Sequence, residues 1–270
     1  MDFEEWYHAE YVQDKAVERE DYAKKDLASA LDLLEKHNTG ATFFVVGELA
    51  RKYPELVSQI AESGHEVAFH AYHHEPLWKK SPETFKQEIE DFNTVVGRTA
   101  TGFRAPSFSL NEKAKWVLSV LEDSGFKYDS SIFPAKTPLY GVRGAPLEPY
   151  KPSHDNIALN DDTAHLWEFP LHVYSLPVLR VPMAGGFYLR FFPINLIKKS
   201  IEKANKKGRP AVIYVHTWEL GSNAPRQKLG YYKSFVTYHN LDKTGSRLGE
   251  LLSKFEFCSV ENYMKEKGLT

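Results

Sequence analysis

The sequence predicts an α/β protein in which short strands alternate with amphipathic helices around a parallel sheet. Two observations carry this prediction. Short β-prone apolar runs alternate with stretches whose apolar residues recur at helical spacing, which is the pattern of successive βα units. The 270 residues are also enough to bury one substantial core, and α/β barrels of this size commonly form a single domain. We therefore expect one domain over residues 1–270.

The expected elements follow one another with few interruptions. Ser81 and Pro82 are a typical N-cap and first-turn pair, and Gly97 is a typical residue at a helix end. In chain order we expect a helix at 26–37, a strand at 41–46, a helix at 54–64, a strand at 65–69, a helix at 82–97, a strand at 101–104, a helix at 112–124, strands at 126–129 and 166–174, a helix at 194–207, a strand at 211–215, a helix at 247–254 and a strand at 256–260.

The regular pattern lapses between residues 130 and 164, where Pro, Gly and Asn are frequent. Such a segment is long for a structureless connection, so we expect a functional loop over the site.

The charge balance argues against polyanionic partners. The chain has 34 basic and 36 acidic side chains, so its formal charge of −2 would not gather a nucleic acid or an anionic membrane. It has no bilayer-spanning apolar segment, and its start lacks the basic and apolar pattern of a leader. We therefore expect a cytoplasmic protein, unless a leader was removed, without nucleic acid partners or stable membrane insertion. The oligomeric state stays open, with a homo-oligomer as one option.

The single cysteine, Cys258, excludes an internal disulfide and a cysteine-rich metal cluster. It lies in the apolar run 255–260, so we expect it to be a buried strand residue.

Ionisable side chains collect where the predicted strands end. His70 and His74 follow one strand, Arg104 ends the next, Asp129 ends another, and His216 directly follows the strand at 211–215. In a parallel barrel the carboxyl ends of the strands form one face, and catalytic groups lie on that face.

His70 and His74 are four residues apart in HAYHH, which places two imidazoles on one side of a helical turn, within reach of one metal ion. A pair of surface or core-edge histidines is the commoner origin of HxxxH taken alone. Here the preceding GHEVAFH, a strand that emerges from a turn, favours metal ligands. His73 lies between them, and its side chain should point elsewhere.

Four motifs resemble those of the polysaccharide deacetylases, carbohydrate esterase family 4. GHEVAFHAYHHE at 64–75 resembles the metal motif, FRAPSFS at 103–109 the arginine motif, YDSS at 128–131 the aspartate motif and VIYVHTWE at 212–219 the final histidine motif. Their order and separations match the family across nearly the whole chain. The opening DFEEWYH, with EFP at 168–170 and AGGFYLR at 184–190, resembles the branch found beside exopolysaccharide gene clusters.

The resemblance implies a distorted (β/α)7 barrel, similar to a TIM barrel, that holds a divalent metal ion, in particular Zn²⁺. By the family pattern Asp2 is the general base and Arg104 holds its carboxylate as an anion, although a simple salt bridge is the commoner role of an arginine. His216 is the general acid, with Asp129 as its orienting partner, although a packed histidine at a strand end is the alternative. Backbone N–H groups just after Asp129 would stabilise the oxyanion.

The start of the chain departs from the family pattern of two adjacent aspartates, because Asp2 is followed by Phe3 and Glu4. Residues two apart on a strand face the same side, so Asp2 and Glu4 would both face the metal while Phe3 packs into the core and Glu5 points away. Glu4 would then complete the metal site with the two histidines. Alternatively, Glu4 and Glu5 are solvated residues of a loose, frayed terminus.

Tyr128, Trp218 and Leu220 are candidates for the walls of the acetyl pocket, and Ser130 is a further candidate for substrate contact. For each of the three wall residues a place in the core is equally plausible.

Three functions follow from these patterns. The favoured one is metal-dependent hydrolysis of the N-acetyl group of an amino sugar, in a polysaccharide or a lipid-linked precursor, with release of acetate. The second is a metal-independent hydrolase of a small amide or cyclic C–N bond on the same barrel. The third is a sugar-binding module whose catalysis has lapsed. Metal analysis separates the first two, and acetate release from N-acetylated oligosaccharides separates both from the third.

Overall fold

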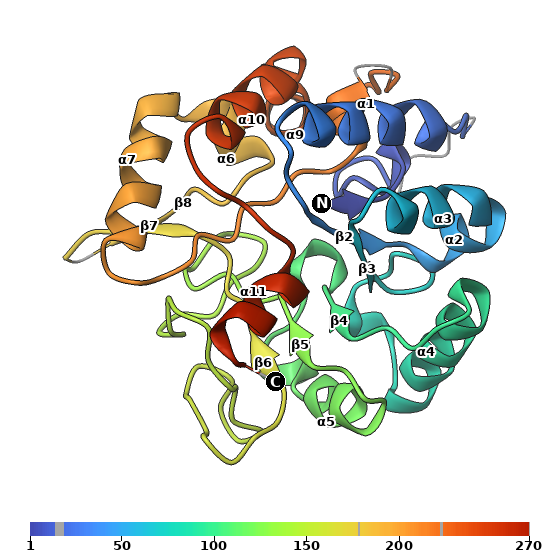
Figure 1. Cartoon of the computed structure of the whole chain (residues 1–270), viewed down its shortest axis with the longest axis vertical. Helices are drawn as coiled ribbons and strands as arrows, with labels where there is room; N and C mark the ends of the chain where they lie inside the picture. Colours follow the sequence, from blue (N-terminus) through green and yellow to red (C-terminus); the bar gives the residue numbers. More distant parts are fainter. Residues whose placement is uncertain (14–18, 178, 222–223, 270) are drawn as a thin grey trace.

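The computed structural model describes residues 1–13, 19–177, 179–221 and 224–269. Its main sheet has six short parallel strands that lie side by side in chain order (Figure 1). Because each strand pairs with the next one along the chain, the sheet curls in one direction, as in a barrel. The strands are β1 (Asp2–Phe3), β2 (Thr42–Val45), β3 (Glu66–Phe69), β4 (Gly102–Phe103), β5 (Tyr128–Asp129) and β6 (Trp167–Glu168).

The segment 211–216 closes the barrel without forming a regular strand. Isolated parallel bridges join Val212 to Leu171 on one side and His216 to Asp2 on the other. The N–H of Asp2 donates to the carbonyl of Val215 at 2.9 Å, so β1 is tied to this segment. The structure is therefore a distorted (β/α)7 barrel, as predicted, with its seventh strand reduced to single bridges.

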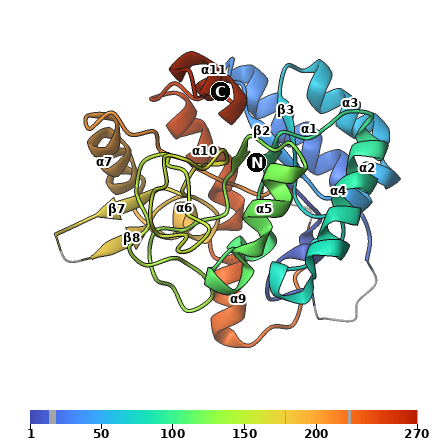
Figure 2. The same ribbon diagram turned by 90° about the horizontal axis from the view of Figure 1, so that it is seen from below.

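Helices cover the outside of this sheet. In Figures 1 and 2 the first five helices lie together around one side of the molecule, while α7 and a two-stranded antiparallel ribbon, β7 (Val173–Ser175) and β8 (Arg180–Pro182), lie on the other. The helices are α1 (Ala23–Lys36), α2 (Gly47–Lys52), α3 (Pro54–Glu62), α4 (Pro82–Val96), α5 (Trp116–Asp123), α6 (Phe187–Phe191), α7 (Ile194–Asn205), α8 (Trp218–Gly221), α9 (Tyr231–Tyr238), α10 (Thr244–Leu252) and α11 (Val260–Lys267), with 3-10 turns at η1 (Trp6–His8), η2 (Leu77–Lys79), η3 (Pro106–Phe108), η4 (Glu112–Ala114) and η5 (Leu241–Lys243).

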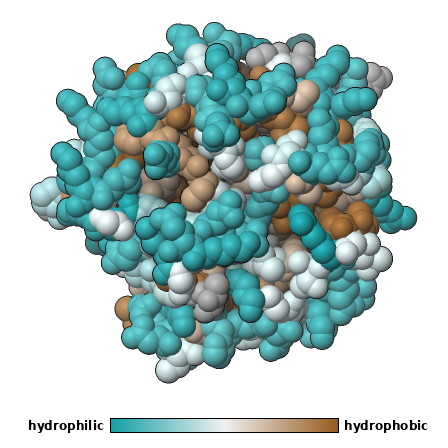
Figure 3. Space-filling view, in the orientation of Figure 1, coloured by the Kyte–Doolittle hydropathy of each residue, from teal (hydrophilic) through white to brown (hydrophobic). Residues whose placement is uncertain are grey.

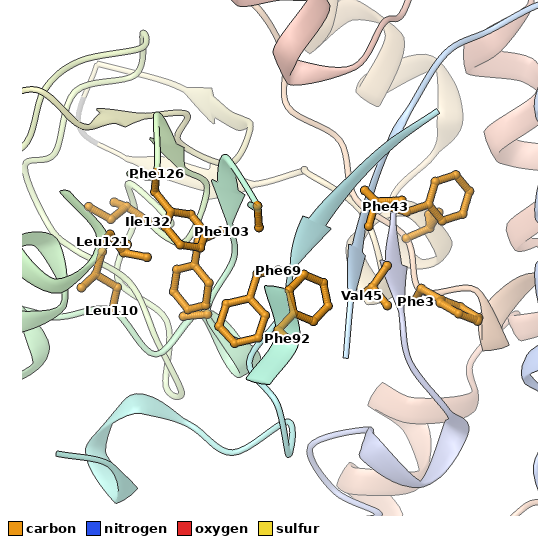
Figure 4. Packing of buried hydrophobic residues seen from close by; sticks show 14 of the residues in the cluster. Phe3, Phe43, Val45, Phe69, Phe92, Phe103, Leu110, Leu121, Phe126 and Ile132 are labelled. Carbon is orange, nitrogen blue, oxygen red and sulfur yellow. The ribbon is translucent and has the colours of Figure 1, made fainter. Parts of the chain in front are cut away.

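Side chains alternate between the two faces of the sheet. Phe43 and Phe69 belong to the main core cluster between the sheet and the helices, where Phe69 packs against Phe92 of α4 (Figure 4). Phe44 and Ala68, one residue away on the same strands, belong to a separate cluster inside the barrel. This alternation decides which residues can reach the end of the barrel where a site forms.

The short helix α11 covers the amino ends of the strands. Its first N–H groups, those of Val260 and Glu261, donate to Thr42 Oγ1 at 2.9 Å and to the Glu66 carboxylate at 3.0 Å. The predicted strand at 256–260 is therefore wrong, because these residues lead into α11 as irregular chain. Cys258 is accordingly exposed and not a buried strand residue.

Most predicted helices are confirmed with bounds shifted by a few residues, but the predicted strand at 166–174 divides into β6 and β7. The segment 130–164 has no regular helix or strand, as expected. Among the described residues, no helix combines the length and the apolar character needed to cross a membrane. On the face that Figure 3 displays, apolar atoms are exposed mainly in hollows between raised hydrophilic side chains.

Candidate active site

A pocket of about 140 Å³ opens at the carboxyl ends of the strands, where ionisable groups gather. A larger cavity, of about 270 Å³, lies beside Met1 and Thr42 at the amino ends, but its lining is mainly apolar. The smaller pocket is therefore the candidate active site, and we call it the site pocket. Its ionisable and polar lining includes Asp2, Glu4, His8, Glu10, Tyr11, His70, His74, Ser107, Tyr140, Arg190, Tyr214, His216, Trp218, Glu219 and Thr237.

Strand alternation brings Asp2 and Glu4 into this pocket together. Both are buried at 2% exposure, while Phe3 between them packs in the outer core. Glu5 is also buried, and its carboxylate accepts hydrogen bonds from the N–H groups of Tyr22 and Ala23 at the start of α1. The alternative of a loose, solvated terminus is therefore wrong for this segment.

Asp2 is held by Arg104, whose Nη1 lies 2.7 Å from Asp2 Oδ1. Burial by itself would raise the pKa of Asp2, but the Arg104 guanidinium and the nearby histidines lower it on balance. Arg104 is itself buried and donates to Ser130 Oγ at 2.8 Å and to the Ser130 carbonyl at 3.0 Å. The aspartate is thus an anion whose position is fixed.

Glu4, His70 and His74 form a cluster suited to a cation. Glu4 Oε2 lies 2.6 Å from His74 Nε2 and 3.8 Å from His70 Nε2. The ring of His70 is oriented by the Arg104 carbonyl, which accepts from Nδ1 at 2.7 Å, so the lone pair of His70 is on Nε2 and faces Glu4. Burial lowers the pKa of His70 to about 4, so its ring is neutral.

The donor set also fits a divalent metal ion on chemical grounds. Glu4 Oε2 is buried, and its polar neighbours among the described residues are the Nε2 atoms of His74 and His70. Two imidazole nitrogens and one carboxylate oxygen are a common ligand set for catalytic zinc. A buried carboxylate oxygen that faces two imidazole nitrogens is well placed to share a cation with them.

His8 joins this cluster, and sequence reasoning missed it. One of its ring nitrogens lies within 4.8 Å of ligand atoms of both Glu4 and His74. Its ring stacks on that of His74, with centroids 5.0 Å apart and planes inclined by 20°. Burial lowers the pKa of His8 to about 3. The motif DFEEWYH contains this histidine, but no spacing in the sequence reveals that η1 turns it back toward the strand end.

His216 lies across the pocket from the histidine cluster. Its Nε2 is 3.9 Å from both Asp2 Oδ2 and Glu4 Oε1. Its Nδ1 lies 3.0 Å from Glu219 Oε2, and Glu219 pairs in turn with Arg190 at 3.1 Å. Burial alone would lower the pKa of His216, but Glu4, Glu219 and Asp2 together raise it to about 9. Its ring is therefore a protonated group.

The predicted partnership of Asp129 with His216 is not present among the described contacts. Asp129 is fully buried beside Glu168, its neighbour on β6, and accepts a hydrogen bond from Ser131 Oγ. Burial raises the pKa of Asp129 to about 6 and, with the charge of Asp129, raises the pKa of Glu168 well above its usual value. Glu219 therefore takes the orienting position that the family pattern assigns to Asp129.

Of the four predicted substrate residues, only Trp218 lines the site pocket. It donates from Nε1 to Glu4 Oε1 at 3.2 Å and stacks on His216. Tyr128 instead donates to Glu66 inside the barrel, and Ser130 supports Arg104. Leu220 packs against the main core. Short-range sequence patterns do not distinguish these four positions, because all of them flank motif residues.

Backbone strain concentrates at this pocket. His74, Ser107 and Phe108 all line it and have positive φ angles of 51°, 53° and 48°. Such conformations are unfavourable for residues other than glycine and persist where surrounding structure enforces them, often at functional sites.

Comparison with known protein families divides the chain near its middle. The model described as "Polysaccharide deacetylase" matches residues 20–128. The model described as "Domain of unknown function (DUF3473)" matches residues 130–265.

Individual relatives cover part of the chain. A peptidoglycan-N-acetylglucosamine deacetylase of Bacillus cereus is 40% identical over 93 residues, which are 32% of this chain and 33% of the relative. A probable polysaccharide deacetylase of Pseudomonas aeruginosa PAO1 has a similar fold, with a TM-score of 0.58, 15% identity and coverage of 89% of this chain and 71% of its own. Puue allantoinase also has a similar fold, with a TM-score of 0.55, 14% identity and coverage of 86% and 68%. The chain spans about a third of the length of the curated relatives that it matches.

Proposed function

Because the chain belongs to the polysaccharide deacetylase family, with the DUF3473 domain as its second half, we propose that it is a metal-dependent N-deacetylase. It hydrolyses the N-acetyl group of an amino sugar and releases acetate. The observation that carries this proposal is the arrangement of Glu4, His70 and His74 beside Asp2 and His216 in one pocket. We also propose that residues 1–270 act as one domain, since the segment 211–216 pairs with β1.

Glu4, His70 and His74 would hold the metal ion, in particular Zn²⁺. When bound, such an ion polarises the acetyl carbonyl and lowers the pKa of a water molecule. The orientation of His70 by the Arg104 carbonyl supports this assignment, because metal-binding histidines commonly donate their other N–H to a carbonyl or carboxylate.

Asp2 acts as the general base. Arg104 occupies Asp2 Oδ1, which leaves Oδ2 as the oxygen that takes the proton from water. The paired guanidinium keeps the carboxylate ionised before the substrate binds, and its two contacts with Ser130 keep the pair in place.

His216 acts as the general acid. The amide C–N bond breaks as the amine nitrogen takes the proton of His216, and the acyl group with the added hydroxyl leaves as acetate. The Glu219 carboxylate on Nδ1 orients the ring so that Nε2 faces the pocket, where the leaving nitrogen must be.

The substrate is proposed to be an amino sugar within a polysaccharide or a lipid-linked precursor, and an exopolysaccharide fits the DFEEWYH and AGGFYLR motifs. Exposed aromatic rings next to the pocket support a saccharide chain, since sugar faces stack on such rings. Phe187 lines the pocket and contacts Phe235 and the exposed Phe191, and Tyr232, 60% exposed, lies against the pocket residue Tyr11.

A metal-independent hydrolase of a small amide remains the second candidate, and the fold likeness to Puue allantoinase is the observation that favours it. It requires another role for the buried cluster of Glu4, His70 and His74.

The deciding experiment is a screen of acetate release from N-acetylated glycans and from small amides, with Zn²⁺ added or with a chelator. We expect release from glycans that stops with chelator and returns with Zn²⁺. Chelator-resistant hydrolysis of a small amide would favour the second candidate. Glycan binding without any acetate release would indicate a lapsed enzyme.

A further inference from the structure

His8 is a buried histidine of the site pocket that the reaction proposed above does not use. Its ring stacks on that of His74. It also meets the ring of Tyr7 edge-on, with 4.8 Å between the centroids of these two rings. Its closeness to Glu4 and His74 suggests a fourth metal ligand at first sight. The hydrogen bond that the ring makes leads to a different role.

The backbone N–H of Glu5 donates to Nδ1 of His8 at 3.2 Å. A backbone amide can only donate, so Nδ1 carries the lone pair and the proton of the neutral ring is on Nε2. A neutral imidazole with its proton on Nε2 cannot bind a metal through that atom. His70 has the opposite tautomer, because its Nδ1 donates to the Arg104 carbonyl. Of these two rings, that of His70 is thus suited to bind a metal and that of His8 is suited to donate.

The reaction needs a donor of this kind. Negative charge develops on the carbonyl oxygen when an amide is attacked, and a fixed N–H aimed at that oxygen stabilises it. The backbone N–H groups after Asp129, which the family pattern offers for this role, are already engaged. Ser130 N donates to the Phe103 carbonyl at 2.9 Å, and those of Ser131 and Ile132 donate to Glu168.

We propose that His8 donates a hydrogen bond from Nε2 to the carbonyl oxygen of the scissile acetyl group and does not bind the metal. Nε2 has no hydrogen-bond partner within the part of the chain that the structure describes, and it is the nitrogen left to face a molecule in the site pocket. The proton stays on His8 throughout, so no covalent step is added. This role rests on the proposed deacetylase function.

The first test is the tautomer itself, measured by long-range ¹H–¹⁵N correlation spectra of ¹⁵N-labelled protein before and after addition of Zn²⁺. We expect His8 to keep its proton on Nε2 in both states, while the signals of His70 and His74 shift with the metal. A His8 signal with metal-bound Nε2 or with the proton on Nδ1 would overturn the proposal. This measurement does not depend on activity, so it stands even if no substrate is hydrolysed.

The second test uses His8→Phe, which keeps a ring to stack on His74 but has no donor, and His8→Gln, whose amide restores an N–H. We expect His8→Phe to lower kcat by ~10²–10³ with KM little changed, as for loss of one oxyanion donor. The kcat of His8→Gln should be at least ~10-fold higher than that of His8→Phe, because its amide restores a donor. Zn²⁺ affinity should stay within about 3-fold of wild type in both variants, because no metal ligand has been removed. His73→Phe is the matched control, since His73 is exposed and pairs with Glu48.

Unchanged kcat in His8→Phe, or a loss of Zn²⁺ affinity beyond about 10-fold, would each overturn the role of His8. Should His8→Phe fail to fold, the tautomer and His8→Gln still decide the matter. Absence of acetate release by the wild type would count against the proposed function instead. The spectra would then still test whether His8 is a donor or a ligand.

Discussion

The imidazole of His216 is bound by the carboxylate of Glu219, three residues further along the same chain, with 3.0 Å between Nδ1 and Oε2. The backbone N–H of His216 donates to the same oxygen at 3.1 Å. His216 lies just before α8 and Glu219 lies within it, so the proposed general acid and its orienting group are three residues apart in the chain. Burial alone would raise the pKa of Glu219, but His216 and then Arg190, which lies against its other oxygen, lower it on balance.

Substitution of Glu219 by Gln should lower turnover by ~10–10², because the ring of His216 loses the charge that orients it and stabilises its protonated form. Metal content should not change. Asp129→Asn is the matched control, since Asp129 lies against Glu168 and Ser131. A larger loss of turnover in Asp129→Asn than in Glu219→Gln, measured on one N-acetylated oligosaccharide, would restore the family assignment of Asp129.

His216→Ala should lower turnover by ~10²–10⁴ while the protein still binds its metal, because the leaving amine loses its proton donor. The measurement is kcat together with metal content by elemental analysis. Metal loss in this variant would make His216 a ligand, and unchanged turnover would remove it from the mechanism.

The carboxylates of Asp2 and Glu4 should divide into base and ligand. Asp2→Asn should keep the metal and lose turnover, whereas Glu4→Gln should weaken metal binding and recover activity in excess Zn²⁺. A metal titration decides the point, and the assignment fails if Asp2→Asn releases the ion while Glu4→Gln holds it as tightly as wild type.

His70→Ala and His74→Ala should lose both metal and activity, since the two ligands that remain hold a divalent ion poorly.

Glu5 should contribute to stability and not to chemistry. Its carboxylate accepts from the N–H groups of Tyr22 and Ala23, so Glu5→Ala leaves two donors at the start of α1 without their partner. We expect a loss of ~1–3 kcal/mol in the free energy of unfolding, measured with urea. Glu48→Ala, at an exposed position near the start of α2, serves as the control and should lie close to wild type.

The Asp129 and Glu168 pair should make stability fall as pH rises. Burial raises the pKa of Asp129 to about 6 and that of Glu168 well above its usual value, so the folded protein keeps protons that the unfolded chain has released. The contribution of this pair to the free energy of unfolding is then greatest below the ordinary carboxyl pKa. It is lost as pH rises through 6 and beyond.

Glu168→Gln removes one of these protons and keeps an acceptor for the N–H of Ile132. As pH rises from about 5 to about 8, its free energy of unfolding should therefore decline less steeply than that of wild type. The two slopes should differ by up to ~1.4 kcal/mol per pH unit. Urea titrations across this range compare the two proteins directly. Parallel curves would mean that the pair does not share a retained proton.

The sequence by itself determined the α/β class, most helices and the residues Asp2, Glu4, His70, His74 and His216 that meet in one pocket. It could do so because periodicity and strand ends are local properties, and because parallel strands present their carboxyl ends on one face of a barrel. Alternation along β1 likewise follows from backbone geometry alone, which is why Asp2 and Glu4 could be assigned to one side.

Only the tertiary structure decided which groups act as neighbours within that pocket. Glu219 and Asp129 are both acidic residues inside matched motifs, but Glu219 lies on α8 beside His216 whereas Asp129 lies on β5 beside Glu168. His8 reaches the cluster because η1 folds back over β1, and its tautomer depends on the N–H of Glu5. Such contacts are set by packing between distant segments, which no periodicity in the sequence encodes.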